Sequence, residues 1–250
     1  MYSLVANVVN ETEKQFWKKK TVFFLILSAL IPLVGALLIA SFQSKLGIAS
    51  ITAADYPILV LGLFTSFILP LFVFMAAADS FAGEASSNTL KIVLLRPISR
   101  FKIYASKHIS LGIYTMLYLI AAGISSILSG LFFSVKAGMP QGILDALLAY
   151  IVAVIPFIAL TCIAVLIAQF TRSGSGALII CIILYMGIKA ASFFLPQVSL
   201  YSLTSYTDWH VLWLSSSVAL GKLISIFMFI AACSILCFTA GFYFFDKKEV

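Results

Sequence analysis

Residues 79–108 combine charged and apolar side chains in a pattern suited to binding a protein partner. Within the segment DSFAGEASSNTLKIVLLRPISRFKIYASKH, the acidic Glu84 lies among five of the chain's sixteen basic residues: Lys91, Arg96, Arg100, Lys102 and Lys107. Apolar anchors fill the groove of a protein–protein interface, while charges fix its register. A basic loop resting on anionic lipid is the alternative. That alternative explains the cations, but not the apolar Leu90 and Leu94 retained in the same segment.

The segment also predicts a short helix, a break and a second helix. Ser87, Asn88 and Thr89 are suited to cap a helix that begins at Leu90. Pro97 ends this helix, because the residue before a proline is displaced from the helical conformation. The following stretch, SRFKIYASKH, then leads as an amphipathic turn into the next apolar run.

Lys189 is the ionisable residue that lies well inside a predicted membrane span, in LYMGIKAASFFL. A charged lysine at the centre of a span costs roughly 2.5–3.5 kcal/mol on insertion scales. Lys189 lies nearer the outer end of its span, so its aliphatic stem could extend outward or pair with another helix. A second interpretation makes Lys189 part of a substrate path, as in ion-coupled carriers.

The sequence offers no constellation typical of an enzyme. An intramembrane hydrolase needs a nucleophile and a base at the same depth, yet both histidines, His108 and His210, fall outside the predicted spans. Cys233 and Cys237 are four residues apart, but no histidine or acid accompanies them as a metal ligand. A phosphate-binding G-x-x-x-x-G-K-[ST] loop is also missing from the sequence. We therefore expect no catalytic residue, no metal site and no cofactor bound by this chain.

The elements that carry these residues are expected to be membrane spans. The 250 residues are 62% hydrophobic and only 10% charged, more apolar than a soluble domain of this size can bury. Six apolar runs are long enough to cross a bilayer as helices: 21–42, 56–78, 109–133, 144–169, 177–195 and 223–245. We expect an all-α integral membrane protein formed by a single transmembrane domain, residues 1–250.

The distribution of basic residues predicts that both termini are cytoplasmic. With the N-terminus inside, twelve of the sixteen basic residues fall in the inner segments, and Lys45, Lys136 and Lys222 fall in the outer ones. The net charge of +7 thus follows from membrane topology, and no nucleic-acid partner is needed to explain it.

Two further segments are expected to lie at the membrane surfaces. In residues 1–20, Val5, Val9 and Phe16 recur at helical spacing, which predicts an amphipathic helix on the inner surface, with Lys18–Lys20 at the headgroups. Residues 196–221 are apolar and aromatic but too short to cross the membrane. They predict one or two short helices, semi-buried in the outer leaflet before the last span; an exposed aromatic loop is the alternative.

The stretch GEASSNTLKIVLLRPISRFKIYASK resembles the segment after the second span in bacterial ABC transporter permeases of the type-2 exporter class. The matching positions are an acid, a Thr-Leu pair, a Leu-Leu pair, a Pro-x-Ser-Arg stretch and a later lysine: Glu84, Thr89, Leu90, Leu94, Leu95, Pro97, Ser99, Arg100 and Lys107. The size of the chain, the six spans, the N-terminal surface helix and the outer segment agree with this resemblance.

The resemblance implies a permease that works with separate cytoplasmic ABC ATPase subunits, which bind ATP and Mg²⁺, and with a second permease, identical or different, in the bacterial plasma membrane. Residues 79–108 would then form a coupling helix that binds a groove of the ATPase. Glu84 and Arg100 are the expected polar contacts, and Thr89, Leu90, Leu94, Leu95 and Pro97 complete the expected interface. An ion-coupled secondary transporter is the alternative function, and the substrate stays open.

Overall fold

The computed structural model of the chain describes residues 4–46, 51–87, 98–133, 139–171, 173–215 and 218–247. Within these residues, six helices are long and apolar enough to cross a membrane: Lys19–Gln43, Asp55–Ser86, Arg100–Gly130, Met139–Gln169, Gly174–Phe194 and Leu220–Asp246. Each overlaps one of the six predicted runs. The all-helical architecture with six long apolar helices is therefore confirmed.

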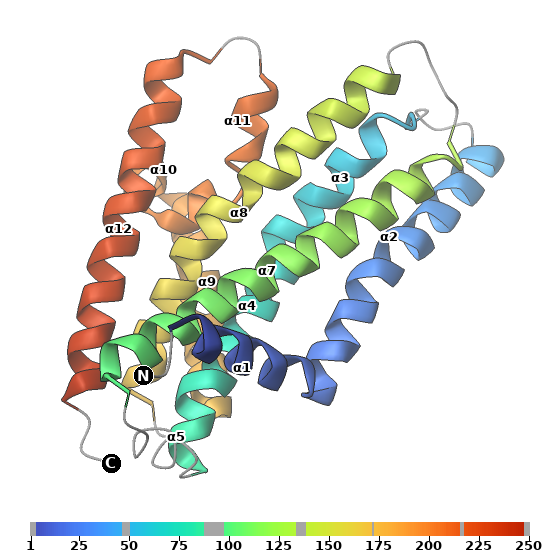
Figure 1. The fold of residues 1–250 in the computed structure, drawn as a ribbon. Helices are drawn as coiled ribbons and strands as arrows, with labels where there is room; N and C mark the ends of the chain where they lie inside the picture. Colours follow the sequence, from blue (N-terminus) through green and yellow to red (C-terminus); the bar gives the residue numbers. More distant parts are fainter. Residues whose placement is uncertain are drawn as a thin grey trace.

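Figure 1 shows these helices as a tilted bundle, with α1 lying across one end. The bounds are α1 Leu4–Phe16, α2 Lys19–Leu46, α7 Arg100–Gly130, α8 Met139–Gln169, α9 Gly174–Phe194 and α12 Leu220–Asp246. The helix α12 finishes at the same end of the bundle that α1 crosses, and we call this the terminal end. The opposite end, the far end, carries α11 (His210–Leu214).

The second span is built from five consecutive helical pieces: α3 Asp55–Leu63, the π-helical η1 Phe64–Ile68, α4 Leu69–Ala78, the π-helical η2 Asp79–Gly83 and α5 Glu84–Ser86. Pro70 has no N–H to donate to the carbonyl of Ser66, four residues earlier. That carbonyl instead accepts a hydrogen bond of 3.0 Å from the Tyr185 hydroxyl of α9. A neighbouring helix thus satisfies a backbone group that lipid could not.

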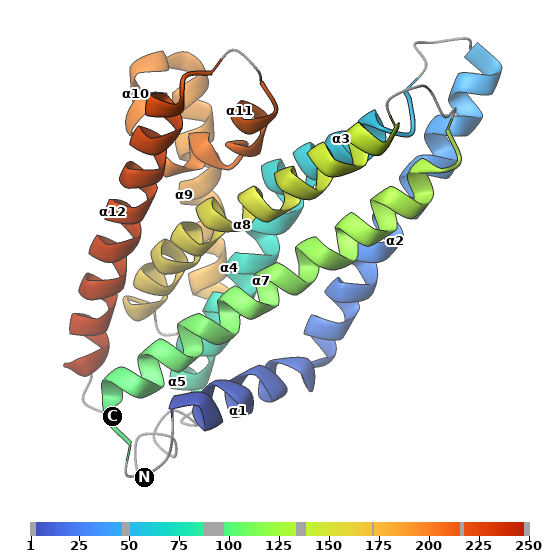
Figure 2. The same cartoon turned by 45° about the horizontal axis from the view of Figure 1, so that its top comes forward.

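The core lies where α4, α7 and α8 meet. Small residues let these helices approach closely, among them Ala77, Ala122, Ala153 and Ala164, all fully buried. Figure 2 shows α2 and α7 running side by side along one edge of the bundle, while α12 lies at the other edge and approaches α7 near the terminal end. The outward surfaces of α2, α9 and α12 are rich in exposed apolar side chains, as expected for helices that face lipid.

Residues 196–214 form short helices and do not cross the bundle. The segment contains α10 Pro196–Tyr201, the 3₁₀ helix η3 Leu203–Tyr206 and α11. Trp209 and His210 are buried, and Trp209 packs with Leu203 and Ile226 in a second apolar cluster. The segment is therefore folded onto α8 and α12 through its aromatic side chains, and the structure does not describe it as an exposed loop.

Candidate functional site

A buried ionic network at the terminal end is centred on Lys107. Lys107 lies two turns into α7, on the face that also buries Ile103, Tyr104 and Ser110. Its side chain is completely buried, and its Nζ lies 2.6 Å from Glu84 Oε2 and 2.9 Å from Glu11 Oε2. The same ammonium donates a hydrogen bond of 3.3 Å to the Ser80 carbonyl. One lysine thus joins three parts of the chain.

Glu84, one of the predicted site residues, is a central member of this network. It opens α5, directly after the π-helical η2, and is 5% exposed. Its second carboxylate oxygen, Oε1, accepts from Lys14 Nζ at 2.6 Å. Glu84 therefore faces inward and pairs with two ammonium groups, Lys14 on α1 and Lys107 on α7. Two cations around one buried carboxylate favour its charged form over the neutral one.

The helix α1 presents its polar face to the protein. Asn7, Glu11 and Gln15 are spaced four residues apart and are buried. Asn7 donates to the Ser106 hydroxyl at 2.9 Å, and Gln15 donates to the Ser80 hydroxyl. The opposite face exposes apolar side chains: Val5, Val9, Phe16 and Trp17. Polar residues inward and apolar residues outward reverse the arrangement of a soluble surface helix.

The lysines that follow α1 differ in their surroundings. Lys20 pairs with Asp79 at 3.4 Å on the exposed side of the network. Lys18 is partly buried, and burial lowers the pKa of its ammonium below the usual range, although the Glu84 and Asp79 carboxylates oppose that shift. The turn between α1 and α2 therefore lies close to the same acidic residues.

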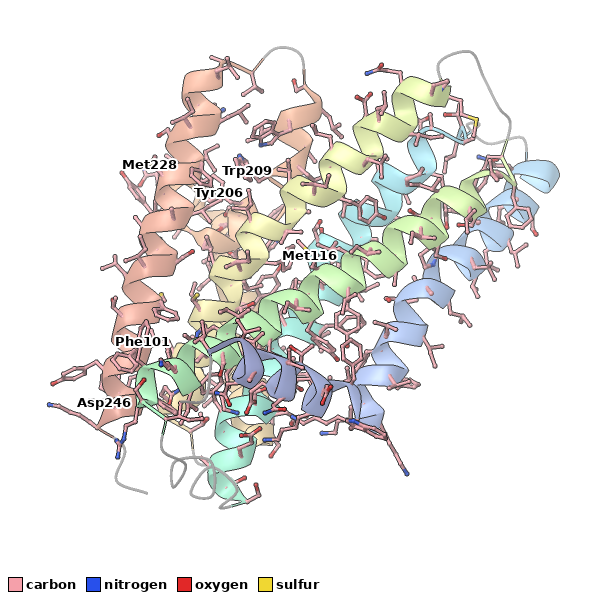
Figure 3. The ribbon with its side chains drawn as sticks, viewed as in Figure 1. Phe101, Met116, Tyr206, Trp209, Met228 and Asp246 are labelled. Carbon is pink, nitrogen blue, oxygen red and sulfur yellow. The ribbon has the colours of Figure 1, made fainter. Side chains whose placement is uncertain are left out.

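The structure separates Glu84 from the other predicted polar contact, Arg100. Arg100 is exposed at the start of α7, and its guanidinium donates to the Asp246 carbonyl at the end of α12. The neighbouring Phe101 packs its ring against Phe242, with centroids 5.4 Å apart. Figure 3 shows Phe101 and Asp246 together at the terminal end. Among the residues that the structure describes, Glu84 and Arg100 thus have different partners.

Five of the predicted interface residues lie outside the described residues: Thr89, Leu90, Leu94, Leu95 and Pro97. The short helix expected from Leu90 lies there as well. What the structure does describe is the two ends of this segment. Glu84 precedes it, Lys107 follows it, and the ion pair between them brings the two ends together.

Lys189, the residue predicted either to pair or to line a path, lies toward the far end of α9. Its Nζ is 3.2 Å from the Thr207 hydroxyl and 3.8 Å from Asp208 Oδ2. Asp208 in turn accepts from the Thr65 hydroxyl of η1 at 2.7 Å. Lys189 therefore connects α9, the short far-end helices and the second span. A role in a substrate path stays a prediction.

Sequence reasoning missed three members of the ionic network: Glu11, Lys14 and Lys107. Glu11 and Lys14 are polar residues of the predicted N-terminal surface helix, and nothing in their spacing indicates that they contact α5 or α7. Lys107 was one position of a family pattern, and we assigned it no role. The missed signal is the lysine itself, since a carboxylate from another helix can offset the cost of burying a cation at the entrance of a predicted span.

Comparison with known proteins identifies the class to which this fold belongs. Residues 10–188, more than half of the chain, match the family described as ABC-2 family transporter protein. The chain therefore belongs to this family of ABC-2 transporter membrane proteins, and its described residues include six candidate membrane spans.

One relative is similar over a shorter stretch. The uncharacterized protein YhcI of Bacillus subtilis (strain 168) is 40% identical over 63 residues, which cover 25% of this chain. The chain spans only about a fifth of the length of that relative, since the match covers 20% of it.

Proposed function

We propose that the chain is the permease of an ATP-driven ABC exporter in the bacterial plasma membrane, with both termini in the cytoplasm. It would work with separate ATPase subunits, which hold ATP and Mg²⁺, and with a second permease. The ABC-2 family supports an ATPase partner in general. Residues 79–108 are the proposed site of coupling, and the terminal end of the bundle is then the cytoplasmic end.

The observation that carries this proposal is the burial of Lys107 between Glu84 and Glu11. A segment that transmits a movement from an ATPase to the spans must be rigidly attached to those spans. The ion pairs attach the start of the third span to the end of the second span and to α1, at 2.6 and 2.9 Å. Breaking a buried pair by removing one partner is strongly unfavourable, so the three elements should move together.

In this mechanism α1 is an amphipathic helix at the inner membrane surface. Its exposed Val5, Val9 and Phe16 would rest among lipid headgroups, while Glu11 fastens it to α7. ATP-driven closure of the motor would displace residues 88–97, and the network would carry that displacement into the spans. Physically, ATP binding at a distant site biases a two-state membrane element.

Co-purification tests this function. The chain should be isolated together with the products of its neighbouring genes, and a Walker-motif ATPase should accompany it and hydrolyse ATP. Transport in vesicles that contain an ion gradient but no ATPase would instead favour an ion-coupled carrier, with Lys189 as its first candidate residue.

Substitution of the predicted contacts tests the coupling site. Glu84→Gln and Arg100→Gln should each separate ATP hydrolysis from transport while the chain still inserts into the membrane. Lys222→Gln is the control, since this residue is an exposed lysine near the start of α12, at the far end and outside residues 79–108. Unchanged coupling in both variants would remove Glu84 and Arg100 from the coupling site.

A further inference from the structure

A cavity of about 750 Å³ lies between α8, α9 and α12, away from the ionic network. Its wall on α9 runs from Cys181 to Ile188, and its wall on α12 is formed around Cys233 and Leu236. Both stretches lie in the middle of helices that are long enough to span a membrane. The seven-residue rise from Cys181 to Ile188 makes this wall roughly 10 Å tall. The cavity thus lies at the depth of the hydrocarbon core.

The polar groups of the cavity gather on one side. The three helices contribute mainly aliphatic side chains and thiols, while Gln197, Tyr201, Ser202 and Thr204 come from the short far-end segment. The Tyr185 hydroxyl, which also faces this region, is engaged by the Ser66 carbonyl. No charged residue is among the described residues that line the cavity. A matching ligand has a long apolar part and an uncharged polar group beside it.

The mouth of the cavity opens sideways toward the membrane. Leu184 and Leu236 line the cavity and are also exposed, by 46% and 67% of their surface. The medium that reaches a lateral opening at this depth consists of lipid chains. Water would gain few hydrogen bonds from such walls, so an apolar chain is the favoured occupant.

We propose that this cavity holds one acyl chain of a phospholipid from the surrounding bilayer. The chain lies along α9 and α12, and the glycerol ester region of the lipid reaches the hydroxyl and amide groups of residues 197–204. The volume falls in the range of pockets that hold small molecules, about 300–1,000 Å³. This site is formed by α8, α9, α12 and the short far-end segment, and it stands apart from any ATPase partner.

Photolabelling in a bilayer tests the site. The full chain is reconstituted in phosphatidylcholine vesicles that contain a phosphatidylcholine with a diazirine in its acyl chain, and adducts are mapped by mass spectrometry. We expect adducts to concentrate on the lining residues Leu184, Ile188 and Leu236. Leu236→Trp puts an indole in the cavity and should lower the adduct yield on α9 about tenfold. This is the loss of affinity expected when roughly two methylene groups of the acyl chain are no longer buried.

Ile235→Trp is the matched control, because Ile235 is the neighbouring residue on α12, is similarly exposed at 63% and does not line the cavity. This variant should leave the α9 adducts unchanged. Adducts spread over all exposed apolar residues in proportion to their exposure would overturn the proposal. Labelling by diazirine palmitate but not by the phosphatidylcholine would assign the cavity to a free amphiphile instead. A second copy of the chain could cover the cavity and prevent adduct formation. Cross-linking between the Cys237 residues of two chains would reveal this arrangement and would also overturn the proposal.

Discussion

The two ends of the bundle hold their lysines in different ways. At the terminal end, Lys107 is completely buried and lies 2.6 and 2.9 Å from two carboxylates. At the far end, Lys189 keeps 30% of its side chain exposed and lies 3.8 Å from Asp208. A buried charge in contact with two partners fixes its surroundings, whereas a half-exposed pair contributes about 0–1 kcal/mol. The comparison indicates a stiff terminal end and a far end that can rearrange at low cost.

The largest effect is expected from Lys107→Met. The substitution leaves Glu84 and Glu11 buried without their shared cation, and such a break costs about 3–5 kcal/mol. Thermal unfolding of the detergent-solubilised chain should show a lower melting temperature, and proteolysis should release α1. Combining Lys107→Met with Glu84→Gln and Glu11→Gln should recover part of the loss. A triple variant as unstable as the single one would show that packing around Lys107, and not its charge, holds this end together.

A smaller and asymmetric effect is expected at the two acids. Glu84→Gln removes a charge that serves both Lys107 and Lys14, while Glu11→Gln removes one that serves Lys107. Hydrogen bonds to charged groups contribute about 1.5–3 kcal/mol each, so Glu84→Gln should be the more destabilising of the two. The measurement is the melting temperature of both variants, side by side at low salt. A larger decrease for Glu11→Gln would contradict the prediction and show that the attachment of α1 contributes most.

Lys189→Met should change stability by less than about 1 kcal/mol, because the pair with Asp208 is long and partly exposed. The matched comparison is Lys107→Met at the other end of the bundle. An equally large loss of melting temperature in both variants would abolish the contrast between the two ends.

The smallest effect concerns pH at the far end. Burial lowers the pKa of His210 below its usual value of 6.5, and the nearby Asp208 only partly opposes this. The unfolded chain binds a proton at a pH where the folded chain does not, so the far-end segment should lose stability as pH falls below about 6.5 and keep it at neutral pH. Tryptophan fluorescence, to which Trp209 and the adjacent Trp213 contribute, reports this change in a Trp17→Phe background. His210→Gln should remove the pH dependence and leave the rest of the unfolding curve in place.

Individual residues show how far sequence reasoning reached. The spans followed from the length of apolar runs, so α8 and α12 were predicted within a few residues. The second span was harder, because Asp79–Ser86 is polar enough to suggest a loop, yet the helix continues through it as η2 and α5. Glu84 was selected as a site residue from its place in a family pattern. Its partner on α1, Lys14, was not predictable, since it lies 70 residues away along the chain.

The sequence by itself determined that the chain is a helical membrane protein, because lipid leaves an apolar run no other way to satisfy its backbone. It also determined the family, through the residues after the second span. Only the tertiary structure decided which face of α1 is buried, which carboxylates hold Lys107 and which partners Lys189 finds. Those outcomes depend on how helices distant in sequence pack against one another. The side-chain periodicity of a single helix does not indicate which other helices it contacts.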